Sequence, residues 1–331
     1  MQYGATSGPA FTVNTGPLSI GVTGGTGFVG RELITRLAAA GHTVRVVTRN
    51  AARADTLLPL SSVEIDVGNV YDPDFLRRRF DGCQVVVNLV GILNERGFGG
   101  GGFRRAHVEF TAGLLRAMRQ ARIPRLLHMS ALNADAAHGR SHYLRTKGAA
   151  EHLVRQETSL QWTIFRPSVI FGAGDSLTLR FAELLRVSGG WLPLARPQAR
   201  FAPIHVSDVA AAFLRALGDR TSIGATYELC GPQILTLAQL VRDTAQAAGL
   251  RCHLLPLPDA VAWLQGALMG LIPGKPFSLD NYRSLLTDSV CRDDGCQRLQ
   301  LSTGSLRAWA PLWLRPPAMG GTAPGAHRDG V

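Results

Sequence analysis

Lysine is almost absent from this chain. Of its 35 basic residues only two, Lys147 and Lys275, are lysines, and the others are arginines. A lysine kept against this bias marks a position that needs a compact ammonium on a flexible stem, because the planar guanidinium of arginine cannot replace it geometrically. Tyrosine is also scarce, at five residues. At these frequencies a Tyr-x-x-x-Lys pair arises by chance about 0.03 times in such a chain, so we interpret "YLRTK", from Tyr143 to Lys147, as functional.

Long apolar runs and clustered cysteines are also missing. No apolar run reaches the ~18 residues that a membrane-spanning helix requires. Residues 1–17 contain no basic residue and no apolar stretch of the kind found in signal peptides. No close histidine cluster accompanies the cysteines, so we predict no metal site and expect reduced, mostly structural thiols in a reducing, cytoplasmic compartment. The cysteines are scattered along the chain: Cys83, Cys230, Cys252, Cys291 and Cys296.

The charge is strongly positive, with a formal net value of +11. Much of the excess lies in residues 95–147, where ten Arg and Lys residues face three Asp and Glu residues. A basic patch attracts nucleic acid, anionic lipid or a phosphorylated cofactor. Because aromatic residues are not interleaved with these arginines and no nucleic-acid-binding motif is present, we predict no nucleic-acid partner.

Apolar runs alternate with segments of helical periodicity along the first half of the chain. The runs at 18–24, 43–49, 63–67, 84–92, 125–132 and within 160–172 read as buried strands, and 28–41, 73–82, 104–121 and 141–153 read as helices. Strands that alternate with helices at this spacing indicate a parallel sheet covered on both faces. We therefore predict an α/β fold with a Rossmann-type doubly wound parallel sheet.

The pattern changes after about residue 170, where helices dominate and extended pieces are short. We predict a loose N-terminal arm over 1–17, a dinucleotide-binding domain over 18–170, and a smaller, helix-rich substrate or lid region over 171–315. Residues 204–220 are expected to return to the first domain. The Pro- and Gly-rich segment 316–331 is expected to be a disordered tail.

A glycine-rich loop joins the first predicted strand to the first predicted helix. In "VTGGTGFVG", Gly24 makes the tight turn, Gly27 admits a pyrophosphate close to the backbone, and Gly30 lets helix and strand pack closely. The phosphates would rest on the helix N-terminus, where N–H groups and the helix dipole favour an anion. The alternative is a tight turn without a ligand. Three neighbours are expected to contact the cofactor as well: Thr26, Phe28 and Val29.

The second predicted strand indicates which dinucleotide binds. An acidic residue that holds the ribose is expected about 20 residues beyond the glycines. The strand ends instead with Arg49, and no acid precedes Asp55. Because a guanidinium pairs well with a 2′-phosphate, we favour NADP(H) over NAD(H); the alternative for Arg49 is a solvated strand end. Asp66 is a candidate partner of the adenine amino group or a simple loop cap, and the strand-end residues Val67, Val90 and Pro167 complete the expected cofactor contacts.

Three residues form the candidate catalytic group. Tyr143 and Lys147 stand four apart on one face of a helix, and Ser130 ends the fifth predicted strand at the edge where ligands bind. Tyr143 would exchange a proton with a carbonyl or hydroxyl group, and Lys147 would lower the pKa of Tyr143 and bind the nicotinamide ribose. Ser130 would hold the substrate oxygen. The alternative is an ordinary surface Tyr and Lys at a helix start.

These motifs resemble a known family. "TGGTGFVG", Ser130, "YLRTK" and "FRPSVIFG" are similar to the short-chain dehydrogenase/reductase superfamily over roughly residues 18–235. "VNLVGIL", "HVEFT", "HMSAL", "RFAPIHVSDVA" and "YELCGPQILTLAQLV" resemble its atypical branch, which includes the NAD(P)H-binding accessory subunit of respiratory complex I and its bacterial relatives. The resemblance implies that Gly24, Gly27, Gly30 and Arg49 contact the cofactor and that Ser130, Tyr143 and Lys147 occupy the catalytic positions. It also implies that these residues can hold a structural cofactor that does not turn over.

Three functions are therefore open. The first is an NADP(H)-dependent oxidoreductase acting on a carbonyl or hydroxyl group, the second is a cofactor-holding structural or assembly protein of a respiratory or quinone-related complex, and the third is a redox sensor. The catalytic group favours the first, whereas the apolar C-terminal segments and the family resemblance favour the second.

Substrate identity is expected to depend on the C-terminal region. The apolar segment 259–274 and the Trp-containing segment 306–315 pack in the core, line an apolar substrate pocket, or dock on a partner or peripherally on the inner face of a membrane. The glycine run at 98–102 is a mobile gate or an insertion.

Overall fold

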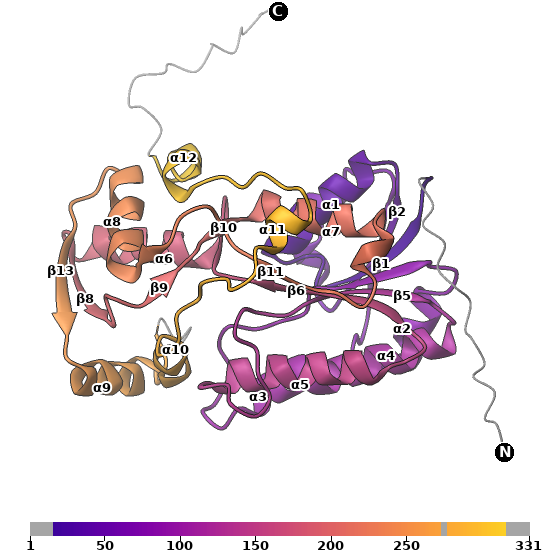
Figure 1. Cartoon of the computed structure of the whole chain (residues 1–331), viewed down its shortest axis with the longest axis horizontal. Coiled ribbons are helices and arrows are strands. Elements are labelled where there is room, and N and C mark those ends of the chain that lie inside the picture. Colours follow the sequence, from indigo (N-terminus) through magenta and orange to yellow (C-terminus); the bar gives the residue numbers. More distant parts are fainter. Residues whose placement is uncertain (1–15, 273–276, 316–331) are drawn as a thin grey trace, which may run out of the picture.

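The computed structural model describes residues 16–272 and 277–315. The expected tail, and the expected arm apart from its last two residues, lie outside these ranges. Seven strands form one parallel sheet in the order β11-β6-β5-β4-β1-β2-β3 (Figure 1), which confirms the doubly wound Rossmann-type fold. The strands are β1 Ser19–Thr23, β2 Thr43–Thr48, β3 Val63–Val67, β4 Val85–Asn88, β5 Arg125–Met129, β6 Gln161–Pro167 and β11 Thr226–Leu229.

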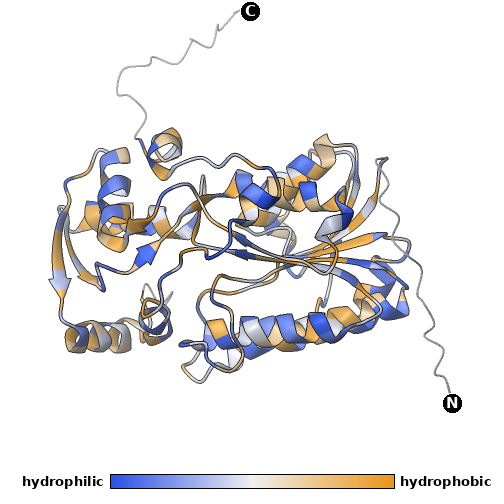
Figure 2. Ribbon diagram, viewed as in Figure 1, coloured by the Kyte–Doolittle hydropathy of each residue, from blue (hydrophilic) through white to orange (hydrophobic). Residues whose placement is uncertain are grey.

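Helices cover both faces of the sheet. On one face, α1 (Phe28–Ala39) and α7 (Val206–Leu217) pack over a core that includes the inward side chains of β1 and β2. On the other face lie α2 (Pro73–Arg79), α4 (Phe110–Gln120) and α5 (His142–Gln156), over a second core. Figure 2 shows the apolar character of the strands between these two layers. Burial on both sides explains why the strands read as continuous apolar runs.

The helix predicted over 104–121 is interrupted. The structure has a short helix α3 (Gly101–Arg104), then a π-helical turn η3 (Arg105–Glu109), then α4. Such π turns are rare and frequently occur at functional sites. The turn carries two side chains that reach the candidate site, Arg105 and His107.

The remaining elements form a smaller region beside the carboxyl edge of the sheet (Figure 1). Its longer helices are α6 (Ser176–Val187), α8 (Leu237–Ala247), α9 (Asp259–Met269) and α10 (Leu279–Ser284). The short elements are β7 Ile170–Phe171, β8 Trp191–Ala195, β9 Arg200–Phe201, β10 Ile204–His205, β12 Leu235–Thr236, β13 His253–Leu257, α12 Leu306–Trp309 and α13 Pro311–Leu314. The short helix α11 Gly295–Arg298 lies outside this region and packs against β11. None of the helices in the described ranges has both the length and the apolar character needed to span a membrane.

Two parts of the C-terminal half join the sheet. Helix α7 packs against α1, and β11 extends the sheet as its seventh strand by pairing with β6. Strand β11 lies within the range 171–315 that the sequence assigns to the smaller region, so that range needs correction. Its four residues are too few to distinguish, by pattern alone, a sheet edge strand from an isolated extended piece.

The expectation that all five cysteines are reduced is wrong. Cys230, just after β11, forms a disulfide with Cys291, with Cα atoms 6.0 Å apart across a sequence separation of 61 residues. The chain returns after α10 to run beside β11, and this long-range contact leaves no local pattern in the sequence. The remaining thiols, Cys83, Cys252 and Cys296, are free. The inference of a reducing compartment therefore loses the observation on which it rested.

Candidate functional site

The strand order reverses between β1 and β4, the place where doubly wound sheets bind their ligands. Gly24 leaves β1 with φ +73°, and a Cβ added there would lie 2.9 Å from the backbone of Leu89 just beyond β4. Gly30 is equally restricted, because its Cβ would lie 2.6 Å from the Gly24 carbonyl oxygen. Gly27 is the N-cap of α1, and neither a capping side chain nor an acidic first-turn residue neutralises the helix start. This cradle fits a dinucleotide pyrophosphate.

The other predicted residues of the loop lie around the start of α1. Thr26 is half-buried, and its carbonyl accepts a hydrogen bond from Arg31 at 3.3 Å. Val29 is buried in the core, whereas the half-buried ring of Phe28 points to a separate cavity. This cavity of about 270 Å³ lies on the α1 and α7 side and shares no lining residue with the candidate catalytic group. Trp309 and Trp313 line it, so the segment 306–315 contributes to a pocket.

The predicted adenosine-binding residues cluster beyond β2 and β3. Arg49 is exposed, and its guanidinium carbon lies 5.6 Å from the ring centroid of Tyr71. Asp66 is half-buried and forms an ion pair with Arg79 of α2 at 3.2 Å, a partner that the sequence did not indicate. Val67 stands at the same edge with half of its side chain exposed.

Lys147 and Ser130 are brought together at the carboxyl edge of the sheet. The buried Lys147 ammonium donates to the carbonyl of Met129, the last residue of β5, at 3.0 Å, and to the carbonyl of Val90, two residues beyond β4, at 3.4 Å. Ser130 directly follows Met129, and its buried Oγ has no hydrogen-bond partner. A buried hydroxyl without a partner is costly, so this orphan group is consistent with a ligand oxygen. Pro167, at the end of β6, accepts a hydrogen bond from Leu132 at 3.0 Å beside them.

Tyr143 lies one helical turn before Lys147. Its half-buried ring meets those of Phe103 and His107 edge to face, with centroids 6.0 and 5.5 Å away. Burial raises the pKa of Tyr143 to about 12, and it lowers the pKa of Lys147 to about 8 against the opposing effect of Glu151. The expectation that Lys147 lowers the pKa of Tyr143 is therefore not met, because burial dominates and the ammonium faces strand carbonyls. Near neutral pH Tyr143 is protonated and Lys147 is charged.

The start of α5 is held by the C-terminal region. Ser141 caps the helix by accepting from the Leu144 N–H at 3.1 Å. Asp280 of α10 accepts from the N–H groups of His142 and Tyr143 at 2.7 and 3.1 Å. These carboxylate contacts satisfy the donors that a helix leaves open at its start and suit its dipole. No local pattern predicts the role of Asp280, because it is 137 residues from Tyr143 in the sequence.

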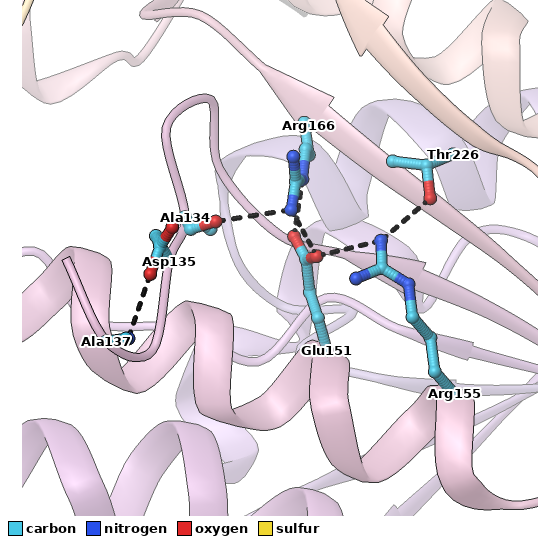
Figure 3. Close-up of polar contacts among 7 residues, drawn as sticks. All are labelled: Ala134, Asp135, Ala137, Glu151, Arg155, Arg166 and Thr226. Atoms are coloured by element: carbon cyan, nitrogen blue, oxygen red, sulfur yellow. Dashed lines mark hydrogen bonds and ion pairs between the residues drawn. The ribbon is translucent and has the colours of Figure 1, made fainter. Parts of the chain in front are cut away.

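A buried ion pair fixes the middle of α5 (Figure 3). Glu151, one turn beyond Lys147, accepts from Arg166 of β6 at 2.8 and 2.6 Å, and its side chain is 1% exposed. Arg155 approaches the same carboxylate at 3.1 Å and donates to Thr226 of β11 at 3.0 Å. The helix that carries Tyr143 and Lys147 is thereby tied to two strands of the sheet.

A second polar group lies beside Lys147 and was missed by sequence reasoning. Asn88 of β4 accepts from the Thr23 hydroxyl at 2.9 Å and contacts His128 Nδ1 at 3.1 Å. Nε2 of His128 is buried without a partner, and burial together with Lys147 lowers the pKa of His128 to about 3. Side chains two positions apart on a strand point to the same face, so those of His128 and Ser130 share one face at the end of β5. In the sequence, Asn88 and His128 stand out as polar residues within the apolar runs "VVVNLV" and "RLLHMS", and this could have revealed the group.

His107 is a third polar residue close to Lys147. It accepts the Ile92 N–H through Nε2 at 3.2 Å, which leaves Nδ1 to donate to the Thr146 hydroxyl at 2.9 Å. Burial, with Lys147 and His128, lowers the pKa of His107 to about 2, so the ring is neutral. No group of three or more His, Cys, Asp or Glu side chains suited to a metal ion occurs in the described ranges.

The glycine run after β4 folds as the start of α3. Glu95 accepts from the N–H groups of Gly100 and Gly102 at 2.6 and 2.7 Å, which closes the loop. The exposed Phe98 ring approaches the end of α9, because a Cβ at Gly270 would lie 3.0 Å from it. This loop links the candidate site with the apolar helix α9.

Comparison with known proteins gives consistent relatives. The NAD(P)H-binding family model matches residues 24–219. NADH dehydrogenase (ubiquinone) 1 alpha subcomplex subunit 9 from Arabidopsis thaliana mitochondria is 31% identical over 322 residues, covering 91% of this chain and 78% of that protein. A ceramide reductase from Caulobacter vibrioides is 31% identical over 255 residues, covering 76% and 77%. The crystal structure of gox2253 shares the fold, with a TM-score of 0.73 at 20% identity over 90% of this chain and 97% of that one.

Proposed function

The chain belongs to the NAD(P)H-binding, atypical short-chain dehydrogenase/reductase family, and we propose that it is an NADP(H)-dependent oxidoreductase acting on a carbonyl or hydroxyl group of an apolar substrate. The observation that carries this proposal is the Ser130 hydroxyl. It is buried without a partner next to Met129, whose carbonyl anchors the Lys147 ammonium. A purely structural site has no need of an unsatisfied hydroxyl at this position.

Tyr143, Ser130 and Lys147 would each have a separate role in the reduction of a carbonyl group. When bound, NADPH supplies a hydride to the carbonyl carbon. Tyr143, protonated near neutral pH because its pKa is about 12, donates its proton to the carbonyl oxygen. Ser130 donates a hydrogen bond to the same oxygen and orients it. Lys147 supplies positive charge at the strand ends and can bind the nicotinamide ribose.

The glycine cradle and Arg49 support NADP(H) as the cofactor. The pyrophosphate would rest on the start of α1, where Gly24, Thr26, Gly27 and Gly30 would contact it, with Phe28 and Val29 contributing through their backbone at the helix start. Val90 and Pro167 would contact the nicotinamide half, and Val67 would contact the adenine. Asp66 would have to share its carboxylate between Arg79 and the adenine amino group.

The apolar surroundings support an apolar substrate. Leu93 and Phe98 are exposed between β4 and α3, and Phe98 borders α9. On α9 the large side chains point outward, including Trp263, which is 51% exposed. Trp309, in contrast, stacks on His205 at 4.2 Å. We therefore assign peripheral contact with an anionic bilayer, from the cytoplasmic side, to α9 rather than to 306–315. The net charge of +11 favours such a surface.

A second function has one specific observation in its favour. Lys147 donates hydrogen bonds to the backbone carbonyls of Met129, at the end of β5, and of Val90, just beyond β4, which is a structural use of the ammonium. Together with the relative from a respiratory NADH dehydrogenase, this supports a cofactor-holding protein of a respiratory or quinone-related complex.

Binding and turnover, measured side by side, separate the two functions. We expect the wild type to bind NADPH and to oxidise it with some member of a panel of apolar carbonyl and quinone substrates. Tyr143→Phe should bind NADPH within about twofold of wild type, while kcat falls about 10²–10⁴-fold because the proton donor is lost. Tyr227→Phe, in β11, is the matched control and should keep kcat. If wild type and Tyr143→Phe bind tightly and neither turns over, the cofactor is a structural element.

A further inference from the structure

The expected 2′-phosphate site contains a second guanidinium. Arg49 follows β2, and Arg105 comes from the π turn η3, 56 positions later by their numbers in the chain. Both approach the same ring: the guanidinium carbons of Arg49 and Arg105 lie 5.6 and 4.8 Å from the centroid of Tyr71. Contact with one aromatic ring places the two cations in the same small region.

Tyr71 is itself held in place. Its ring packs edge to face on Phe110 of α4 with centroids 5.8 Å apart, and its N–H donates to the Asn69 side chain at 3.1 Å. The ring therefore fixes where both guanidinium groups rest. Tyr71 is a positioning residue for the two arginines.

The charges at this place are unbalanced. In the described ranges, no ion pair joins Arg49 or Arg105 to a carboxylate, and both side chains are exposed. Neighbouring arginines behave differently: Arg104 pairs with Glu109 at 3.6 Å, and Arg79 pairs with Asp66 at 3.2 Å. Two like charges gathered on one ring without a carboxylate favour an anionic ligand with several acceptor oxygens.

The π turn explains how Arg105 reaches this position. One residue more per turn than in an α-helix rotates the preceding segment by roughly 100° about the helix axis relative to α4. Within the same turn the buried His107 packs edge to face against the ring of Tyr143, whereas Arg105 is turned toward the ring of Tyr71. One irregular turn thus serves both the catalytic end and the adenosine end.

We infer that Arg105 is a second determinant of NADP(H) specificity, binding the adenosine 2′-phosphate together with Arg49 across Tyr71. The inference rests on the proposed function, because it places the adenosine of the cofactor beyond β2. Recognition of the phosphate is shared between a strand end and a helical turn, so an Arg49 substitution alone leaves part of the selectivity.

The test compares the affinities of NADPH and NADH for the purified full chain by fluorescence titration. Arg105→Ala and Arg49→Ala should each weaken NADPH binding about 10–100-fold, the loss typical of a charge-assisted hydrogen bond, and change NADH binding by less than about twofold. The double variant should bind the two dinucleotides almost equally. Arg104→Ala is the matched control, an adjacent exposed arginine already paired with Glu109, and should leave both affinities unchanged.

Competition with 2′,5′-ADP and 5′-ADP isolates the phosphate from the rest of the cofactor. Arg105→Ala should weaken the binding of 2′,5′-ADP and leave the binding of 5′-ADP unchanged. Tyr71→Leu should lower the NADPH preference, and Tyr71→Phe, which keeps a ring for both cations, should retain most of it. If Arg105→Ala weakens the binding of NADPH and NADH equally, or weakens neither, the inference is wrong. The proposed function would still stand, because the wild type would still bind the dinucleotide. A wild type that binds neither dinucleotide would overturn the proposed function and this inference with it.

Discussion

Helices α5 and α9 differ in the side chains that they bury: α5 buries charged side chains, and α9 exposes apolar ones. α5 buries a lysine and a glutamate, Lys147 and Glu151, and ties both to the sheet. α9 has no basic residue, buries only Ala262 and Gly266, and leaves Val261, Trp263, Leu264 and Leu268 about half exposed. Burying charge costs free energy that only exact geometry recovers, whereas exposed apolar groups are tolerated only at a cost in solubility. The difference separates a helix built for fixed chemistry from one suited to docking.

The largest effect should come from removing the charge at the centre of α5. We expect Glu151→Ala to lower the free energy of unfolding by about 3–5 kcal/mol, because Arg166 would be left partly buried without its partner. Denaturant unfolding would measure this. The control is Glu32→Ala on α1, whose half-buried i,i+4 pair with Arg36 should contribute about 0.5 kcal/mol or less. Equal losses for the two variants would show that α5 is not anchored through Glu151.

An intermediate effect is expected from the covalent link between the sheet and the C-terminal region. Cys230→Ser or Cys291→Ser should lower the free energy of unfolding by about 2–4 kcal/mol, since the bond closes a long loop in the unfolded chain. Wild type in dithiothreitol should lose a similar amount. The half-buried free thiol of Cys252 provides the control, and Cys252→Ser should keep the wild-type difference between oxidised and reduced samples. If dithiothreitol leaves the unfolding midpoint of the wild type unchanged, the result would argue against the disulfide bond.

The smallest effect on stability should come from α9. Trp263→Ser is expected to lower the free energy of unfolding by about 1 kcal/mol or less, because half of the side chain is already exposed. It should nevertheless reduce co-sedimentation with anionic liposomes at low salt, since the apolar face would enter the bilayer interface. Trp309→Ser, which alters a ring stacked on His205, should leave co-sedimentation unchanged. A wild-type protein that stays in the supernatant at low salt would rule out this docking surface.

Local patterns explain which parts of the molecule could be predicted. Apolar runs, the glycine loop and the Tyr143–Lys147 spacing are short-range features, and periodicity detects them. The strand β11 was too short to assign, and the π turn has no known letter pattern in "RAHVE". Asp280, the Cys230–Cys291 bond and the meeting of Arg49 with Arg105 depend on segments far apart in the chain. Burial of Tyr143 also depends on the assembled fold, which is why its raised pKa was not anticipated.

The cap that Asp280 places on α5 makes the order of the helix start depend on the position of α10. A displacement of α10 that broke both hydrogen bonds would leave two N–H donors open and withdraw a carboxylate from the positive end of α5. The first turn of α5, which carries Tyr143, would then be free to fray. The placement of Tyr143 is therefore tied to a side chain 137 residues away in the sequence.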